Sequence, residues 1–197
     1  MKFLVISDTH GKTEKVQEIY NKIGDIDSII HLGDYEKDAK YLESSLGCDV
    51  ISVRGNMDGG YSKDDFKILD TECGRILLTH GHMQNVKNSV QSLMYFAEEQ
   101  GCSTVLFGHT HRALNADADG LRLINPGSIT LPADGSRGTY AILTIEDGKL
   151  DVEIMEIEKS DTTSGNNTSG GNSAPSKSKP KVQGGFIRDL LNNSDRF

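Results

Sequence analysis

The first part of the chain alternates short apolar runs with segments of helical periodicity. The runs are rich in β-branched residues, each is followed by polar residues and a glycine, and they read KFLVIS from Lys2, IDSIIHLGD from Ile26 and CDVISVRGN from Cys48. The spacing of apolar residues between them predicts helices over residues 13–23 and 35–46. Because this alternation requires crossover connections, the strands should form a parallel sheet whose carboxyl ends share one edge.

After Asn56 the pattern changes. The segments DFKILD and GRILLTHGH should pair around residues 72–74, a helix should follow over 85–100, and STVLFGHTH resumes the pattern of a buried strand. Asp-Gly turns at 119–120 and 147–148 predict further hairpins, so antiparallel strands should dominate the second half. The chain is expected to be α/β, with two packed mixed β-sheets flanked by helices in a four-layer αββα sandwich.

The composition divides the chain into three parts. Residues 1–158 can bury one core and should form a single globular domain. Residues 159–183 are rich in Ser, Gly, Asn and Lys and cannot offset their own ordering entropy, so they are expected to be a flexible linker. Residues 184–197 should form a short amphipathic segment. Within it, residues 186–191 are either a docking helix for a protein partner or part of a frayed extension.

The charge balance restricts the class of partner. Lys and Arg number 21 against 29 Asp and Glu, a formal net charge of −8. Long nucleic acids are therefore improbable partners, and a small anionic substrate would need a local positive site. Three dispersed cysteines fit neither a disulfide framework nor a thiolate zinc site, which favours a reducing, cytoplasmic location. No segment approaches the length of a membrane span.

Metal-ligating residue types stand where the predicted strands end. They are Asp8, His10, Asp34, Asn56, His80, His82, His109 and His111. Alternate residues of an extended chain point the same way, so the pairs in DTH and HTH can each direct both side chains towards one point. In a sheet of this type, ligands bind at the carboxyl ends of the strands. The pattern therefore predicts a metal site at this edge.

The ordered motifs DTHG, GD, GN, HGH, GHTH and NPGS over roughly residues 1–157 resemble the calcineurin-like metallophosphoesterases, in particular their small bacterial and archaeal phosphodiesterase branch. The resemblance implies the calcineurin-like fold and two metal ions. One ion would be bound by Asp8, His10 and His111, the other by Asn56, His80 and His109, with Asp34 bridging both. Such mixed imidazole and carboxylate ligands suit Mn²⁺, Fe²⁺, Ni²⁺, Co²⁺ or Zn²⁺ better than Mg²⁺ or Ca²⁺. Manganese is the choice that the family favours.

The expected chemistry is hydrolysis of a phosphate ester. Two divalent ions, less two carboxylates and a bridging hydroxide, leave a net charge of about one positive unit, which attracts phosphate. The hydroxide would attack phosphorus directly, with catalytic roles for Asp34, Asn56 and His82, the last two also binding substrate. Many members of the family carry a proton-donating histidine where this chain has Met57. The branch that lacks it is associated with diesters, so a phosphodiesterase acting on small phosphodiesters is expected.

Several neighbouring residues have a structural interpretation instead. His31 is expected to be a hydrogen-bonded core histidine, and Arg54 and Arg112 are expected to be solvated beside turns, with phosphate contact as the alternative. The turn NPGS at 125–128 should support the metal loops, and its Ser128 is a further candidate to approach the site. The three cysteines read as small core residues.

Two other functions compete with the phosphodiesterase. One is a non-catalytic scaffold, similar to the retromer subunit that shares this fold and binds partners through its surface. The metal positions of that subunit are degraded, whereas the full ligand set stands in this chain, which favours an enzyme. The other is a nuclease acting on short oligonucleotides, which the acidic balance and the lack of an aromatic stacking platform disfavour.

Overall fold

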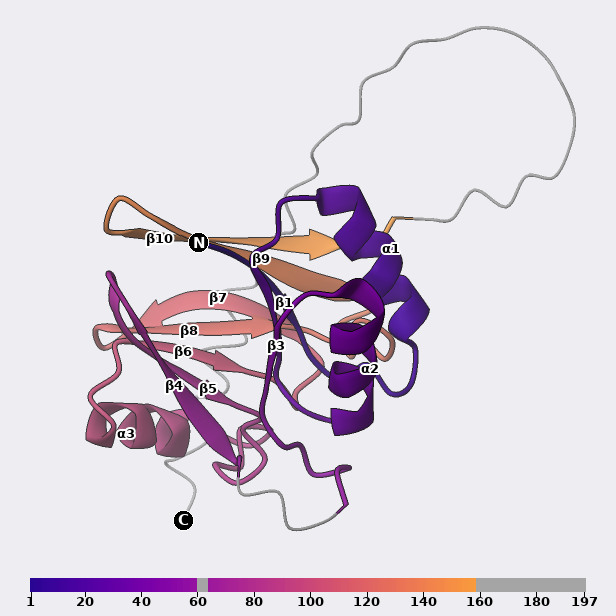
Figure 1. Ribbon diagram of the computed structural model, residues 1–197. Coiled ribbons are helices and arrows are strands. Elements are labelled where there is room, and N and C mark those ends of the chain that lie inside the picture. Colours follow the sequence, from indigo (N-terminus) through magenta and orange to yellow (C-terminus); the bar gives the residue numbers. More distant parts are fainter. Residues whose placement is uncertain (60–63, 159–197) are drawn as a thin grey trace, which may run out of the picture.

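The first sheet brings together the two ends of the folded region. The computed structural model describes residues 1–59 and 64–158 (Figure 1). The first sheet has the order β10-β9-β1-β2-β3. Its strands are β1 (Lys2–Ile6), β2 (Ser28–His31), β3 (Val50–Ser52), β9 (Thr139–Glu146) and β10 (Lys149–Glu156). β1, β2 and β3 pair in parallel, while β9 lies antiparallel between β1 and β10.

The second sheet has the order β4-β5-β6-β8-β7. Its strands are β4 (Phe66–Thr71), β5 (Gly74–Thr79), β6 (Thr104–Phe107), β7 (Ala113–Ala118) and β8 (Leu121–Pro126). β5, β6 and β8 are parallel, and β4 and β7 are antiparallel edge strands. The second half is therefore more mixed than the turn signals indicate. Hairpin turns reveal only strands that are neighbours in sequence, whereas β5, β6 and β8 pair through longer connections.

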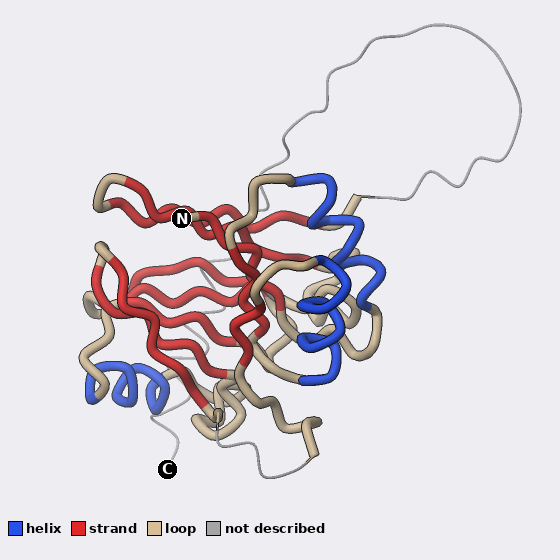
Figure 2. The backbone as a smooth tube through the Cα atoms, in the orientation of Figure 1, coloured by secondary structure: helices blue, strands red, loops and turns tan. Residues whose placement is uncertain are grey.

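In the part of the chain that the structure describes, three helices cover the outer faces of the two sheets (Figures 1 and 2). α1 (Thr13–Ile23) and α2 (Glu36–Leu46) pack on the first sheet, and α3 (Gln91–Glu99) packs on the second. Along β1, Phe3 and Val5 face the other sheet, whereas Leu4 and Ile6 face the helices. This alternation with both faces buried is what a central strand of a layered fold requires. The predicted αββα sandwich is confirmed.

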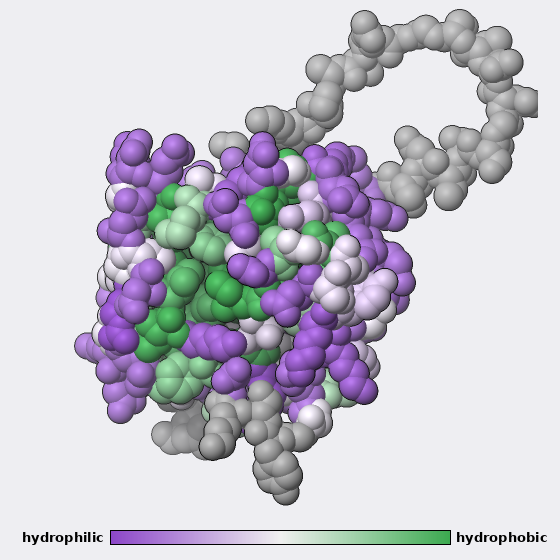
Figure 3. All heavy atoms as spheres, viewed as in Figure 1, coloured by the Kyte–Doolittle hydropathy of each residue, from purple (hydrophilic) through white to green (hydrophobic). Residues whose placement is uncertain are grey.

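The apolar core between the sheets is open at one edge. β3 and β4 are the edge strands there, and the partly buried Ile51 and Leu69 pack against the core from them. Figure 3 shows hydrophobic side chains gathered on this face, between the strands of the two sheets.

The third helix differs from expectation. It begins at Gln91, not at residue 85, because Asn85 has a left-handed backbone (φ 54°) and residues 82–88 form turns.

The expected linker (159–183) and amphipathic segment (184–197), with the docking proposed for 186–191, lie outside the described residues. The division into these parts stays a prediction. Among the described residues, no helix is long and apolar enough to cross a membrane.

Candidate metal centre

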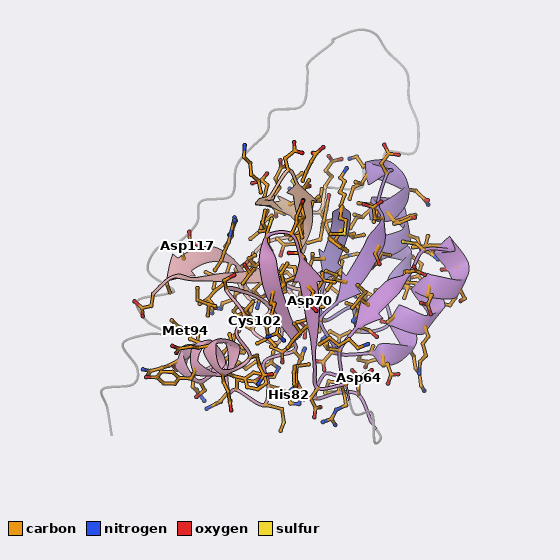
Figure 4. All side chains as sticks on the ribbon, turned by 60° about the vertical axis from the view of Figure 1, so that its left-hand side comes forward. Asp64, Asp70, His82, Met94, Cys102 and Asp117 are labelled. Atoms are coloured by element: carbon orange, nitrogen blue, oxygen red, sulfur yellow. The ribbon has the colours of Figure 1, made fainter. Side chains whose placement is uncertain are left out.

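The carboxyl ends of strands from both sheets meet at one site. Asp8 follows β1, Asp34 follows β2 and Asn56 follows β3; His80 and His82 follow β5, and His109 and His111 follow β6. Figure 4 shows His82 at the lower end of the sandwich, far from Asp117 on β7. The deepest of these side chains are the buried Asp8, Asp34 and His80, while the other imidazoles are half-buried. The site is therefore open to solvent on one side.

Five of the predicted ligands have a left-handed backbone. They are Asp8 (φ 54°), His10 (48°), Asp34 (60°), His109 (66°) and His111 (56°). The expectation that alternate residues of an extended strand aim the side chains is therefore wrong in its geometry, because the strands end before these residues. Residues other than glycine seldom adopt this conformation, and it persists only where the surroundings fix it. Strain of this kind is concentrated at functional sites.

The side chains form two groups of potential metal ligands. Asp8, His10 and His111 offer ligand atoms that all lie within 4.8 Å of one another, and so do Asp8, Asp34 and His80. The first group is the set that the resemblance implies for one ion. Within the described residues Asp8 is common to both groups, whereas Asp34 is in only one. The bridging role of Asp34 stays a prediction.

The ring of His80 indicates what the second group binds. Its Nδ1 lies 2.7 Å from the carbonyl oxygen of Leu32 and can only donate a proton there. In a neutral imidazole, Nε2 then carries a lone pair. Around this Nε2 stand three oxygens, Asn56 Oδ1 at 3.2 Å, Asp34 Oδ1 at 3.5 Å and Asp8 Oδ1 at 4.0 Å. A cation satisfies all four atoms at once.

His111 repeats this arrangement in the first group. Its Nδ1 lies 2.7 Å from the carbonyl oxygen of Leu131, and its Nε2 lies 3.0 Å from Asp8 Oδ1. Within residues 1–59 and 64–158, two other buried nitrogens, His10 Nε2 and His82 Nδ1, find no hydrogen-bond partner, and neither does Asp8 Oδ1. Buried polar atoms are rarely left unpaired, so the donor set fits metal ions.

His109 and His82 lie beside the second group. The ring centroid of His109 is 5.0 Å from that of His80, and the centroid of His82 is 5.3 Å from His80 and 6.2 Å from His109. Asn56 reaches the same place through its contact with His80. The structure therefore gathers all eight candidates at one site, with His82 alongside the proposed second ion.

The ionisation of these groups matches metal binding. Burial opposes the ionisation of Asp8, but the rings of His111 and His80 and the hydroxyl of Ser7 together hold its pKa at about 2. Burial lowers the pKa of His109 to about 4, and burial together with His80 and Arg54 lowers the pKa of His82. Both rings are therefore neutral at pH 7, the form that binds metals.

His111 differs, because its close contact with the Asp8 carboxylate raises its pKa. A proton on Nε2 would occupy the place that a metal ion takes between these two groups. Metal binding at the first group is therefore expected to displace a proton.

A carboxylate outside the ligand set holds the first loop. Oδ2 of the buried Asp38, in the first turn of α2, accepts hydrogen bonds from Thr9 Oγ1 (2.6 Å) and from the Gly11 nitrogen (2.7 Å). Both neighbours of His10 are thus bound to one oxygen. The Thr9 hydroxyl also lies 3.0 Å from His31 Nε2, and the Gly33 nitrogen donates to His31 Nδ1 (3.3 Å). His31 is therefore the hydrogen-bonded core histidine expected.

A second carboxylate, Asp58, joins two other ligand loops. Its Oδ1 accepts from the nitrogens of Tyr35 (2.8 Å) and Glu36 (2.6 Å), and its Oδ2 accepts from the Gly55 nitrogen (2.8 Å). It fixes the segment after Asp34 against the segment before Asn56. Neither Asp58 nor Asp38 is predicted from the sequence. Their acidic character beside ligand motifs is the only signal, and aspartate is common at such turns.

The NPGS turn supports two loops of the site, as expected. Asn125 Nδ2 donates to the Gly108 carbonyl (2.9 Å), and Ser128 Oγ donates to the Asp8 carbonyl (3.0 Å). Ser128 therefore contacts the backbone of a ligand loop.

Arg54 binds Asp65 through Nε at 2.7 Å, so it is an ion-paired residue and not simply a solvated one.

Comparison with known proteins agrees with this geometry. The family model for the calcineurin-like phosphoesterase superfamily domain matches residues 1–148. The probable metallophosphoesterase YsnB of Bacillus subtilis is 38% identical over 149 residues, which cover 74% of this chain and 85% of that protein. The vacuolar protein sorting-associated protein 29 of Schizosaccharomyces pombe is 29% identical and covers 66% and 73% of the two chains.

A solved structure described as a novel archaeal phosphodiesterase has a TM-score of 0.61 and 27% identity, with 79% of this chain and all (100%) of that chain covered. The chain therefore belongs to the calcineurin-like phosphoesterase superfamily. The family implies divalent metal ions and hydrolysis of phosphoric esters, and the two ligand groups are candidate positions for those ions.

Close packing at Gly55 generates the first prediction. A Cβ at this position would lie 2.8 Å from the Cα of Asp34, and closer still to its nitrogen and Oδ1. Gly55→Ala should therefore lower the free energy of unfolding by about 1–3 kcal/mol and weaken Mn²⁺ binding, measured by urea denaturation and calorimetric titration. Gly59→Ala is the control, because its Cβ would meet no atom of the described residues within 4 Å. Equal behaviour of the two variants would contradict the account.

The buried ring of His31 generates a pH prediction. Burial lowers its pKa to about 4 from the ordinary 6.5. The unfolded chain therefore takes up a proton that the folded chain refuses, so stability should fall by about 3 kcal/mol as the pH drops from 6.5 to 4. In His31→Gln this part of the pH dependence should vanish. Denaturant unfolding of metal-free protein at pH 7 and pH 4.5 measures it; parallel losses in both proteins would refute the assignment.

Proposed function

We propose that the chain is a dinuclear metal-dependent phosphodiesterase that hydrolyses small phosphodiesters by direct attack of water. The observation that carries the proposal is the pair of imidazoles, His80 and His111, whose Nδ1 atoms face backbone carbonyls while their Nε2 atoms face carboxylate oxygens. Unless a proton or a metal ion stands between them, each Nε2 would bring a lone pair against the lone pairs of a carboxylate oxygen. Two divalent ions held there would lower the pKa of a water molecule and offset the charge of the phosphate.

The donor set narrows the choice of metal. Imidazole nitrogens outnumber carboxylates in the proposed ligand set of Asp8, His10, Asp34, Asn56, His80, His109 and His111. This composition supports a first-row transition metal over Mg²⁺ or Ca²⁺. We propose Mn²⁺ because the family resemblance favours it, with Ni²⁺, Fe²⁺, Zn²⁺ and Co²⁺ as alternatives.

The residues around the proposed ligands bear on which leaving groups the enzyme can release. His82 is half-buried beside the second group, and its lowered pKa keeps the ring neutral at pH 7. A neutral ring can donate a hydrogen bond to a phosphate oxygen, but it is seldom charged and so makes a weak general acid. Met57 carries no proton to donate. We therefore expect fast turnover only of diesters with good leaving groups.

A partner-binding scaffold is the second candidate, because a vacuolar protein sorting-associated protein is among the relatives. The catalytic function is preferred because strained backbone, unpaired buried donors and neutral imidazoles coincide at the metal positions. A surface that only binds partners has no need of these features. We propose a cytoplasmic location on the evidence of three free cysteines, Cys48, Cys73 and Cys102.

Removal of single ligands tests the proposal. Asp34→Asn and His109→Ala should each reduce hydrolysis of an activated aryl phosphodiester in Mn²⁺ by a factor of at least about 10³, because the second cation loses a ligand. Both variants should also lose the rise in unfolding temperature that Mn²⁺ gives the parent protein. Asp117→Asn, at the far end of the second sheet, is the control. Near-normal rates in either ligand variant would remove the dinuclear mechanism.

The extent of the catalytic unit can be tested separately. The family model ends at residue 148, and the described fold ends at 158. Deletion of residues 160–197 should leave the rate of aryl phosphodiester hydrolysis within about twofold of the full chain, because the chain's metal ligands all precede the deletion. A large fall in the rate would mean that the deleted residues belong to the active site.

A further inference from the structure

Several residues next to proposed ligands carry exposed apolar side chains. The described residues include nine large hydrophobic side chains that are exposed, and four of these adjoin site residues. These four, here called the apolar rim, are Tyr35 (38% exposed), Met57 (59%), Met83 (66%) and Leu131 (51%). Scattered apolar residues on a surface need no explanation, but a concentration of them at a ligand site does.

Backbone hydrogen bonds connect two members of the rim to proposed ligands. The Met57 nitrogen donates to Asp34 Oδ1 at 2.8 Å, and the Leu131 carbonyl oxygen accepts from His111 Nδ1 at 2.7 Å. Met83 directly follows His82. The backbones of Met57 and Leu131 therefore lie against proposed ligands, and Met83 follows a site residue on the loop after another strand.

Tyr35 is the most informative member of the rim. Its φ of 80° lies in the left-handed region, which a bulky aromatic residue rarely adopts. The hydrogen bond from its nitrogen to Asp58 fixes this backbone, and the ring packs edge-on against His10 with centroids 5.2 Å apart. Strain held in place by the surrounding structure points to a functional role for the residue. Because the ring remains partly exposed, its burial offsets little of the backbone strain.

We propose that the apolar rim binds the organic ester group of the substrate, so that the enzyme prefers phosphodiesters with an aromatic ester group over those with a small alkyl group. The inference rests on the proposed phosphodiesterase function and specifies its substrate class. The buried donors would bind the charged phosphorus centre, while the rim would remove the apolar group from water. An apolar subsite of this kind discriminates by about 10-fold to 200-fold.

The experiment compares two diesters that have the same leaving group. Full-length protein in Mn²⁺ is assayed with bis(para-nitrophenyl) phosphate and with methyl para-nitrophenyl phosphate, and the ratio of the two kcat/KM values is taken. In Tyr35→Asn this ratio should fall by about 10-fold, mostly through a higher KM for the diaryl substrate. Asparagine tolerates the left-handed backbone, so the fold should be preserved. Differences in intrinsic reactivity cancel between variant and parent.

Three further variants complete the design. Tyr35→Phe should keep the ratio, because the rim acts through the ring. Met57→Ala should lower it independently of any effect on residue 35. Tyr41→Asn, at an exposed tyrosine (53%) on α2, is the matched control and should leave the ratio unchanged.

Binding of unreactive diesters gives a readout that does not depend on catalysis. Calorimetric titration of the Mn²⁺-loaded protein should show about 10-fold weaker binding of diphenyl phosphate to Tyr35→Asn than to the parent, with dimethyl phosphate unaffected. If the parent hydrolyses neither diester, the proposed function fails. If it hydrolyses both, and the rim variants change both substrates and both ligands equally, the function stands and the inference about the rim is wrong.

Discussion

The site depends on an ionised carboxylate that has no access to water. Asp8 is 0% exposed, yet its pKa is held at about 2, so it carries a full charge inside the protein. A buried charge is costly unless it is paired. Oδ2 accepts hydrogen bonds from the Ser7 hydroxyl (2.5 Å) and the His109 nitrogen (3.2 Å), whereas Oδ1 faces the Nε2 atoms of His111 and His80. A positive charge must stand in front of Oδ1, and a proton or a metal ion can supply it.

The sandwich positions the groups that surround the buried charge of Asp8. Strands of both sheets deliver their carboxyl ends to one place, and the loops that follow adopt backbone conformations that are unfavourable in isolation. Hydrogen bonds from Asp38 and Asp58 hold those loops, and the close approach of Gly55 to Asp34 leaves no room for a larger residue. The core between the sheets supplies the free energy that keeps the strained loops in place. Stability and ligand geometry are therefore coupled at these positions.

The proposed metal ligands bear on the type of reaction, whereas the residues around them bear on the choice of substrate. The ligand set is the one that the superfamily resemblance implies, and the reaction expected from it is hydrolysis of a phosphoric ester. The side chains next to the ligands, such as Tyr35 and Met57, are where substrate selection is expected. In the proposed mechanism, methionine in place of a proton donor would restrict the leaving group, and an exposed aromatic ring would offer contact to an apolar ester group. An open site can thus be permissive in its chemistry and still selective for one class of substrate.

The sequence alone determined the layered α/β fold, the first two helices and the residue types at the strand ends, because periodicity and residue chemistry are local properties. The tertiary structure decided the rest. The left-handed backbone at His10 and His111, the membership of Asp8 in both ligand groups and the support from Asp38 arise from contacts between segments far apart in the chain. The third helix begins late for a related reason, since Asn85 turns the chain where apolar spacing alone would continue a helix. Spacing shows which face a residue occupies, but not the backbone angle that neighbouring loops impose on it.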